Sequence, residues 1–173
     1  MSRMPIAIRE YKESDYAASK ALWGQLAQYH AEIYEDPSIA GNDPGRGLDE
    51  YLGREDCIGM WIAESDQKII GFAGLLDVVG EEGVAEIEPV VVENSLRGEG
   101  TGSKLIQHIS EMAKQKGFHF LCIRPEIRNE KAFVLYVNLG FNHVGSIQLF
   151  KELISSDRKW KSGIRIHGEE LLY

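Results

Sequence analysis

A strand passes into a helix through a glycine-rich loop in residues 90–103, which read Val90-Val91-Val92-Glu93-Asn94-Ser95-Leu96-Arg97-Gly98-Glu99-Gly100-Thr101-Gly102-Ser103. The valines are typical of a strand, the glycines stand at alternate positions, and the helix is expected from Gly100 onward. Glycines allow a backbone to approach a ligand closely, and the free N–H groups and positive dipole end of a helix favour an anion. Arg97 can add a bidentate contact to phosphate. The segment therefore predicts a cradle for a pyrophosphate group.

Two familiar phosphate-binding motifs do not fit this loop. A Walker loop needs a glycine, four residues and then Gly-Lys-Ser or Gly-Lys-Thr, and this spacing does not occur here. A dinucleotide-binding fingerprint needs a third glycine where Ser103 stands. Three glycines that serve only a tight turn remain an alternative when the loop is taken alone.

The rest of the chain predicts one mixed sheet with helices between its strands. Apolar residues from Leu22 to Ile33 recur at spacings of four, three and four residues, which predicts a first helix that ends near Tyr34. Three consecutive strands exclude a regular βαβ repeat, and a helix that crosses over between Val92 and Phe118 predicts one parallel pair. The expected elements are, in order, a strand around 6–8, the first helix, a short helix over 48–53, strands over 60–64, 69–79 and 84–92, a helix over 100–116, a strand over 118–124, a helix over 129–139, and final strands over 141–153 and 164–173.

Residues 35–47 predict a long polar loop, because they are dense in Pro, Gly, Asn and Asp. A loop of this length inside a compact domain is more often functional than idle. We therefore take it as the candidate segment for binding an acceptor molecule, with a plain surface loop as the alternative.

The composition fits a single globular domain over residues 1–173. Hydrophobic residues make up 43% of the chain and charged residues 27%, as in an ordinary packed protein. No apolar run approaches the roughly 18 residues that a membrane-spanning helix needs. Met1 to Pro5 lead into an alternating stretch without the apolar core of a secretory signal. We expect a cytoplasmic protein without a membrane partner.

The formal net charge of −8 argues against nucleic acid as a partner, since the basic residues are dispersed along the chain. An excess of carboxylates suits a cationic acceptor better. Cys57 and Cys122 form no CxxC motif and the histidines show no ligand spacing, so we expect neither a metal site nor a disulfide. His30 is the one histidine close enough to the polar loop to be considered for substrate contact, against a structural role.

Two motifs resemble the signatures of the GNAT superfamily of acetyl-CoA-dependent N-acetyltransferases. The first signature, Arg/Gln-x-x-Gly-x-Gly/Ala, is matched by Arg97, Gly100 and Gly102. The second is matched downstream by Asn129-x-x-Ala132-x-x-x-Tyr136-x-x-x-Gly140-Phe141. Two motifs at the right separation are more specific than either alone, and the order of elements also resembles the family along nearly the whole chain.

The resemblance implies an α+β fold with a mostly antiparallel sheet of about seven strands, flanked by about four helices. A parallel pair, the strands ending at Val92 and Arg124, would splay apart and hold the pantetheine arm of acetyl-CoA in the gap. The residues implied in cofactor binding are Val90, Val91, Val92, Arg97, Gly98, Glu99, Gly100, Thr101, Gly102, Ser103, Asn129, Ala132 and Phe133.

Acetyl transfer to an amine makes use of both a base and an acid. An alkyl amine with a pKa near 10.4 is neutral in only about one molecule in a thousand at pH 7, a penalty of roughly 4 kcal/mol. The leaving thiolate benefits from a proton donor, and a tyrosine stays protonated at pH 7. The resemblance implies Tyr136 as this acid. The alternative is an aromatic side chain that only packs on the apolar face of its helix.

Glu86 and Glu88 are the candidates for the base. They lie two apart in one predicted strand, so both side chains point to the same face, just before the residues implied in cofactor binding. Residues 85–87 are similar to the segment that carries the catalytic glutamate in the histone-acetylating branch of the superfamily. One carboxylate can serve as base while the other holds a cationic substrate. Two solvated carboxylates, or a water chain in place of a single base, remain alternatives.

The sequence thus predicts an N-acetyltransferase that uses acetyl-CoA as co-substrate, needs no metal and acts on a primary amine by direct attack in a ternary complex. A small polycationic acceptor, such as a polyamine or an aminoglycoside-like amine, is favoured. The alternatives are a peptide Lys or N-terminal acetyltransferase, an enzyme for a longer acyl-CoA, and a non-catalytic acyl-CoA-binding module. Because dimers are common in the family, the resemblance also allows a homodimer.

Overall fold

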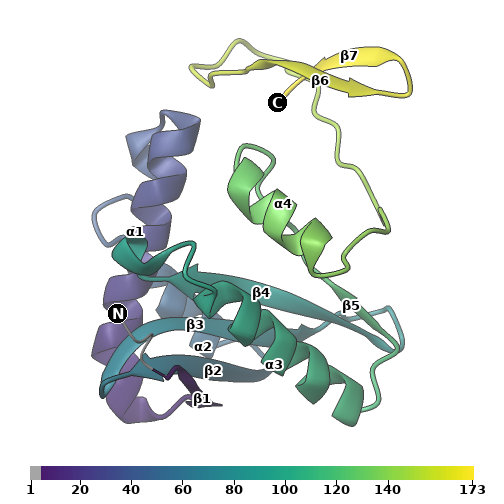
Figure 1. The fold of residues 1–173 in the computed structure, drawn as a ribbon. Coiled ribbons are helices and arrows are strands. Elements are labelled where there is room, and N and C mark those ends of the chain that lie inside the picture. Colours follow the sequence, from purple (N-terminus) through teal and green to yellow (C-terminus); the bar gives the residue numbers. More distant parts are fainter. Residues whose placement is uncertain (1–4) are drawn as a thin grey trace.

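A five-stranded mixed sheet forms the centre of the molecule (Figure 1). The computed structural model describes residues 5–173; residues 1–4, on which part of the expectation about a secretory signal rests, lie outside the described residues. The strands follow one another in chain order, and every neighbouring pair is antiparallel except the last, β4 with β5. The strands are β1 Ala7–Glu10, β2 Cys57–Ser65, β3 Lys68–Asp77, β4 Val84–Val92 and β5 Phe120–Cys122.

Helices cover both faces of this sheet. Helices α1 (Tyr16–Tyr34) and α2 (Arg46–Leu52) lie on one face, and α3 (Thr101–Gln115) lies on the other, where it connects the parallel strands β4 and β5 (Figure 1). Helix α4 (Glu130–Asn138) follows β5 and lies beyond the sheet edge. Single 3₁₀ turns occupy Glu13–Asp15, Pro37–Ile39 and Asn94–Leu96.

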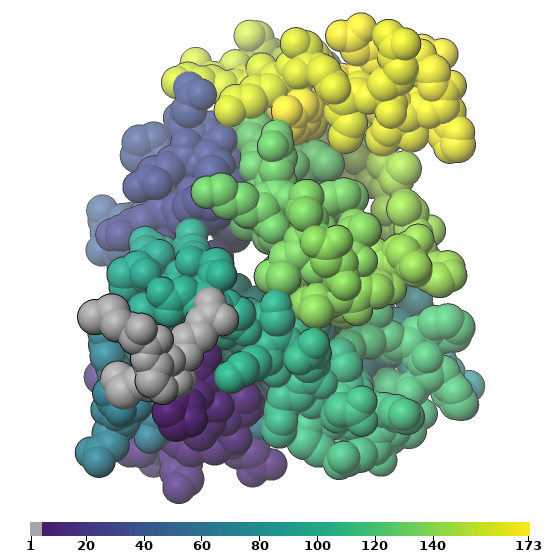
Figure 2. Space-filling view, in the orientation of Figure 1, coloured from purple at the N-terminus to yellow at the C-terminus, as the bar shows by residue number. Residues whose placement is uncertain are grey.

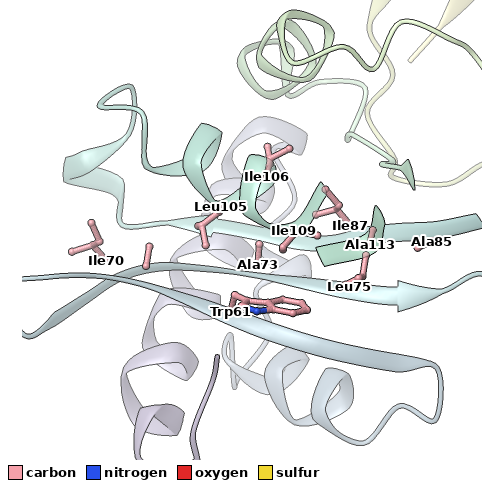
Figure 3. Close-up of a cluster of buried hydrophobic side chains, with 11 residues drawn as sticks. Trp61, Ile70, Ala73, Leu75, Ala85, Ile87, Leu105, Ile106, Ile109 and Ala113 are labelled. Carbon is pink, nitrogen blue, oxygen red and sulfur yellow. The ribbon is translucent and has the colours of Figure 1, made fainter. Parts of the chain in front are cut away.

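The core is divided between the two faces. On the α3 side, Leu105, Ile106 and Ile109 pack on strand residues such as Trp61 and Ile87 (Figure 3). These helix positions recur at three and four residues, which makes one apolar stripe. On the other side Leu22 of α1 and Leu48 and Tyr51 of α2 pack on Ile62 and Phe72. The sheet is therefore buried on both faces, which holds β4 rigidly between two layers.

Strand β4 contains a bulge near its centre. Ala73 pairs with Val90 and Leu75 pairs with Ile87, so three steps along β4 match two steps along β3. An extra residue reverses the alternation of side chains beyond it. Ile87 and Val90 therefore both pack toward α3, although they lie an odd number of residues apart, and Val91 packs toward α1 and α2.

Beyond Glu86 the two parallel strands diverge. Only Val84–Glu86 of β4 pair with β5, and the partners are Phe120 to Cys122. Beyond this point β4 keeps its pairing with β3 as far as Val92, while no described strand pairs with its other edge. The splayed parallel pair that the resemblance implies is thus present, and we call the space between the two diverging arms the fork.

The C-terminal part differs from the sequence prediction. The strand expected over residues 141–153 does not form; this segment has no regular structure, and most of its side chains are exposed. The alternation of apolar residues predicted a strand, but a strand also needs a partner for its backbone groups, and none of the described strands pairs with this segment. The single strand expected over 164–173 is a hairpin of β6 (Ser162–Ile166) and β7 (Glu169–Leu172), which turns at His167 and Gly168 and pairs only with itself.

The remaining elements match the prediction closely. The long first helix ends at Tyr34, and the helix expected over 100–116 spans Thr101–Gln115. Strand β5 is shorter than the expected 118–124.

Across residues 5–173 no helix is both long and apolar enough to cross a membrane. Cys57 and Cys122 are half-buried and unbridged, and the described residues contain no cluster of three or more side chains that suits a metal ion.

Candidate functional site

The glycine-rich loop presents free backbone donors at the start of α3. Gly98 and Gly100 adopt positive φ angles of 83° and 91°, a region that other residues rarely enter. The helical hydrogen bonds begin at Lys104, whose N–H donates to the Gly100 carbonyl (3.1 Å). The N–H groups of residues 101–103 therefore lie outside the helical ladder, at the positive end of the helix dipole. Such a terminus favours anions, so the fold provides the backbone donors that the predicted cradle requires, and the cradle itself stays a prediction.

Gly102 marks the point where three elements meet. A methyl group placed on its Cα would lie 3.6 Å from Leu135 Cδ2 of α4 and 3.7 Å from Val92 Cγ2 of β4. The start of α3, the end of β4 and α4 are thus neighbours at one end of the fork. Figure 2 shows a hollow here, bordered by the end of α1, the β4–α3 loop and α4.

The predicted cofactor-contacting part of β4 borders the fork. Val90, Val91 and Val92 pair with β3 along one edge, and their other edge faces the diverging arm. An extended molecule can pair with such an edge as an additional strand does. In the loop that follows β4, Glu99 is exposed and Ser103 is half-buried.

The Arg97 side chain is turned toward α1. Its guanidinium lies over the ring of Tyr29 at 4.5 Å, and its Nε donates to the Val92 carbonyl (3.3 Å). Partial burial of the guanidinium lowers the pKa of Arg97, and Tyr29 and Glu32 oppose this effect. Arg97 thus lies along the end of β4, beside the loop that presents the free N–H groups.

Asn129 lies on the opposite arm as the N-cap of α4. Its side-chain oxygen accepts hydrogen bonds from the Ala132 N–H (3.2 Å) and from the Tyr29 hydroxyl (3.3 Å). Ala132 is half-buried in the first turn of the helix and Phe133 is exposed. Asn129 was predicted from the second motif, whereas its bond to Tyr29 was not, because a contact across 100 residues leaves no local pattern.

Tyr136 packs on the α3 side of the fork. Its ring meets Phe141 edge-on at a centroid distance of 6.3 Å and adds to the core cluster of that side. Burial raises the pKa of Tyr136 to about 12. The phenol therefore keeps its proton at neutral pH, as a proton donor must.

Glu86 lies at the vertex of the fork. It is paired in register with Cys122, the last residue of β5, and its residue surface is only 5% exposed. Its carboxylate forms an ion pair with Arg124, which follows β5. Burial raises the pKa of Glu86, and the nearby charge of Arg124 partly opposes this rise. A buried carboxylate of raised pKa is a typical general base.

Glu88 differs from its neighbour in exposure. It lies two residues further along β4 on the same face and is exposed to solvent. The Arg54 guanidinium donates two hydrogen bonds to the Asp56 carboxylate, at 2.8 and 2.7 Å. This contact raises the pKa of Arg54, and the nearby charges of Glu88 and Glu86 add to the rise. The sequence identified the two carboxylates but neither arginine, because their proximity depends on how the strands align.

The predicted residues divide into two groups on either side of the sheet. Val90, Val92 and Tyr136 pack in the cluster on the α3 side. Glu86 and Glu88 lie on the face that α1 and α2 cover, and Val91 and Arg97 contact that layer as well. The fork connects these two sides.

His30 is half-buried, and burial lowers its pKa, which favours the neutral form.

Comparisons with known proteins agree with this architecture. The model of the acetyltransferase (GNAT) family matches residues 19–141. A glucosamine 6-phosphate N-acetyltransferase of Trypanosoma brucei brucei is 27% identical over 140 residues, which cover 79% of this chain and 88% of that protein. The solved structure of an aminoglycoside N-acetyltransferase in complex with CoA superposes with a TM-score of 0.63 at 18% identity, over 88% of this chain and 98% of that one.

Several relatives are matched over only part of their length. A probable N-acetyltransferase of Xenopus laevis, camello, is 28% identical over 82 residues, which is 47% of this chain but 37% of the frog protein. The matched parts of the next two relatives, from Methanocaldococcus jannaschii and Homo sapiens, are 42% and 39% of their lengths. The chain therefore spans less than half the length of these curated relatives.

Proposed function

Since the chain belongs to the acetyltransferase (GNAT) family, we propose that it transfers the acetyl group of acetyl-CoA to a primary amine by direct attack within a ternary complex. The observation that carries the proposal is the fork. One of its ends borders free helix N–H groups, and its vertex holds the buried carboxylate of Glu86. One end of the fork therefore suits the anionic part of the cofactor, and the vertex supplies a proton acceptor.

The loop and the β4 edge fit the chemistry of acetyl-CoA. Donors at residues 101–103 would hold the pyrophosphate, because helix N-termini favour anions. The free edge of Val90–Val92 would pair with the amide groups of the pantetheine arm. Arg97 beside the end of β4, and Asn129, Ala132 and Phe133 at the start of α4, would complete the site from both arms.

In the proposed reaction the amine nitrogen attacks the thioester carbonyl carbon and the carbon–sulfur bond breaks. Glu86, directly or through water, takes the proton that the amine loses, and Tyr136 protonates the departing thiolate. Glu88, exposed on the same face, would attract the positive charge of the incoming amine. The two sides of the sheet support this division, because the acid packs on the α3 side and the carboxylates point to the other.

We favour a small polycationic amine as the acceptor. The net charge of −8 and the exposed Glu88 support a cation, and the polar segment 35–47 follows α1 on the carboxylate side. The trypanosomal relative is named for an acceptor that carries a phosphate. Arg54 and Arg124, the guanidiniums near the carboxylates, are already paired with Asp56 and Glu86, which makes a phosphate less suitable here.

Other predictions remain as proposals beside this one. A peptide Lys or N-terminal amine, a longer acyl-CoA and a non-catalytic acyl-CoA-binding role are the alternatives that the experiment below separates. A single domain, a cytoplasmic location and a homodimer stay predictions, as does the expectation of no metal, nucleic acid or membrane partner.

The test measures release of the CoA thiol from acetyl-CoA with a chromogenic thiol reagent. The acceptor panel contains polyamines, aminoglycosides, glucosamine 6-phosphate, neutral amino acids and lysine peptides. We expect turnover with a polycationic amine, and a loss of about ten- to a hundredfold in Tyr136→Phe. Turnover of neutral amino acids without polyamines would exclude the proposed acceptor class. CoA binding by calorimetry without turnover of any amine would favour the non-catalytic module.

A further inference from the structure

Helix α1 contacts both arms of the fork. Toward the β4 arm, the side chain of Gln25 accepts a hydrogen bond from the Asn94 N–H (3.0 Å). Toward the β5 arm, the Tyr34 hydroxyl donates to Glu126 (2.6 Å). Tyr29 lies between these two contacts along the helix. It follows Gln25 by four residues and therefore lies on the same face of the helix as Gln25.

Tyr29 itself touches both arms. The face of its ring carries the guanidinium of Arg97 at 4.5 Å, and Arg97 belongs to the β4–α3 loop. Its hydroxyl donates to the side-chain oxygen of Asn129 (3.3 Å), the N-cap of α4. One half-buried side chain thus connects the two groups that lie on opposite sides of the fork.

Each of these contacts restricts a side chain that would otherwise rotate. Arg97 is placed between an aromatic face and the Val92 carbonyl, so its guanidinium is held along the end of β4. The Asn129 oxygen accepts two hydrogen bonds, from Ala132 and Tyr29, which fixes the plane of its amide. Groups that are ordered before a ligand arrives lose less entropy when they bind it.

We propose that Tyr29 is a positioning residue for the acyl-CoA site, which holds Arg97 and Asn129 in place from the acceptor side of the sheet. The inference rests on the proposed function. It gives Tyr29 a role in the affinity for the cofactor, although α1 belongs to the layer on the opposite face from α3. The same helix leads into segment 35–47, so the cofactor site and the candidate acceptor segment share one rigid support.

The test compares Tyr29→Phe with Tyr16→Phe, two changes of the same kind in the same helix. Tyr16 donates to Asp49 (2.6 Å), far along α1 from the glycine-rich loop, so its variant loses a hydroxyl contact without touching the fork. Calorimetric titration with CoA gives the dissociation constant and needs no acceptor. We expect Tyr29→Phe to weaken CoA binding about threefold to tenfold, as loss of one hydrogen bond would, and Tyr16→Phe to bind as the wild type does.

A double-mutant cycle tests whether the hydroxyl acts through Asn129. In the Asn129→Ala background, Tyr29→Phe should have no further effect on the dissociation constant, because its partner is already gone. With an acceptor in hand, the KM for acetyl-CoA should rise in Tyr29→Phe while kcat stays near the wild-type value. A Tyr29→Leu variant, which also loses the stack with Arg97, should bind CoA more weakly than Tyr29→Phe does.

The outcomes are distinct. Equal CoA affinity of Tyr29→Phe and the wild type overturns the proposal, and so do equal losses in Tyr29→Phe and Tyr16→Phe. Additive effects of the Tyr29 and Asn129 changes also overturn it. A wild-type protein that binds no CoA overturns the proposed function itself before any variant is compared.

Discussion

At the scale of single residues, Glu86 combines burial with a charged partner. The residue is 5% exposed and its carboxylate is paired with Arg124, and burial nevertheless raises the pKa of Glu86 above the ordinary 4.5. A carboxyl group whose pKa is raised by folding binds its proton more tightly in the folded state. Its ionisation therefore lowers stability as pH rises through and above 4.5.

The first prediction concerns Glu86→Gln. The glutamine cannot ionise, so the free energy of unfolding of the variant relative to wild type should improve as pH rises from about 4 to 7. Because Glu86 is the proposed base, its replacement should also lower kcat by about a hundredfold or more. The limb that the Glu86 carboxylate contributes should disappear from the pH profile of kcat/KM. For the stability measurement, the exposed Glu88→Gln serves as the control. Denaturant unfolding at several pH values and the two pH–rate profiles are the measurements; an unchanged profile in Glu86→Gln would reject it as base.

Residues of the site could be predicted from the sequence where their role depends on their own neighbours in the chain. Gly100 was identified from the local loop pattern, and Asn129 was implied by the second motif of the resembled family. Arg124 was not, since its ion pair with Glu86 requires the alignment of β4 with β5. Tyr29 could be placed on an apolar helix face, but its link between two distant segments follows from the tertiary fold alone.

At the scale of elements, two glycines at the start of α3 differ in whether their backbone requires a glycine. Gly100 is the N-cap with a φ of 91°, and Gly102 lies in the first turn with ordinary van der Waals space for a methyl group. The backbone at Gly100 requires a glycine, whereas the backbone at Gly102 does not.

We therefore predict different results for Gly100→Ala and Gly102→Ala. The first should lower the free energy of unfolding by about 1–2 kcal/mol, the cost of a left-handed conformation for an L-residue. The second should change it by about 0.5 kcal/mol or less, since alanine suits a helix. CoA binding should weaken more in Gly100→Ala, because the loop that carries the N–H donors shifts. Equal effects in the two variants, measured by denaturant unfolding and calorimetry, would contradict this assignment.

Elements with a strong local pattern could be predicted, and elements that need a distant partner could not. Strand β4 has the expected bounds of 84 and 92, and α3 begins and ends within a residue of expectation. The segment 141–153 alternates in a similar way but finds no strand to pair with among the described residues. Periodicity predicts which side chains share a face, and says nothing of whether a neighbouring edge is within reach.

At the scale of the whole molecule, the β6–β7 hairpin is attached through Arg128. This arginine is 8% exposed and donates to the carbonyls of Lys159 and Tyr173, the latter at 2.9 Å. Its guanidinium also lies over the ring of Tyr34 at 4.7 Å. The hairpin is therefore connected to the end of α1 through a residue of the β5–α4 segment.

We predict that Arg128→Ala loosens the hairpin before it affects the central sheet. Loss of a charged hydrogen-bond donor should lower the free energy of local opening by about 1.5–3 kcal/mol, which is roughly a tenfold or larger rise in amide exchange over residues 162–172. Arg128→Lys keeps the charge without the planar donor geometry and should give an intermediate rise. Hydrogen exchange followed by mass spectrometry provides the comparison. Unchanged exchange in the hairpin would show that Arg128 does not hold it.

The parallel pair in the topology followed from an inference about a crossing helix. A helix between Val92 and Phe118 predicted the parallel pair, and β4 and β5 do pair in this way. The separation of the hairpin from the central sheet could not be predicted, because it depends on long-range contacts such as those of Arg128 rather than on any pattern within residues 162–172.

Because of the bulge in β4, the face to which each side chain points depends on the exact number of residues in the strand. Because one additional residue reverses the alternation, the half that carries Glu86 and the half that carries Val92 are out of phase by a single position. Removing the extra residue at the bulge would leave Ile87 and Val90 two positions apart, so a regular strand would still direct both toward α3. Removing a residue elsewhere in β4 would instead turn every side chain on one side of the deletion to the opposite face of the sheet. A single-residue deletion outside the bulge would act on the strand as a frameshift acts on a gene, with each later position intact in identity and wrong in its surroundings.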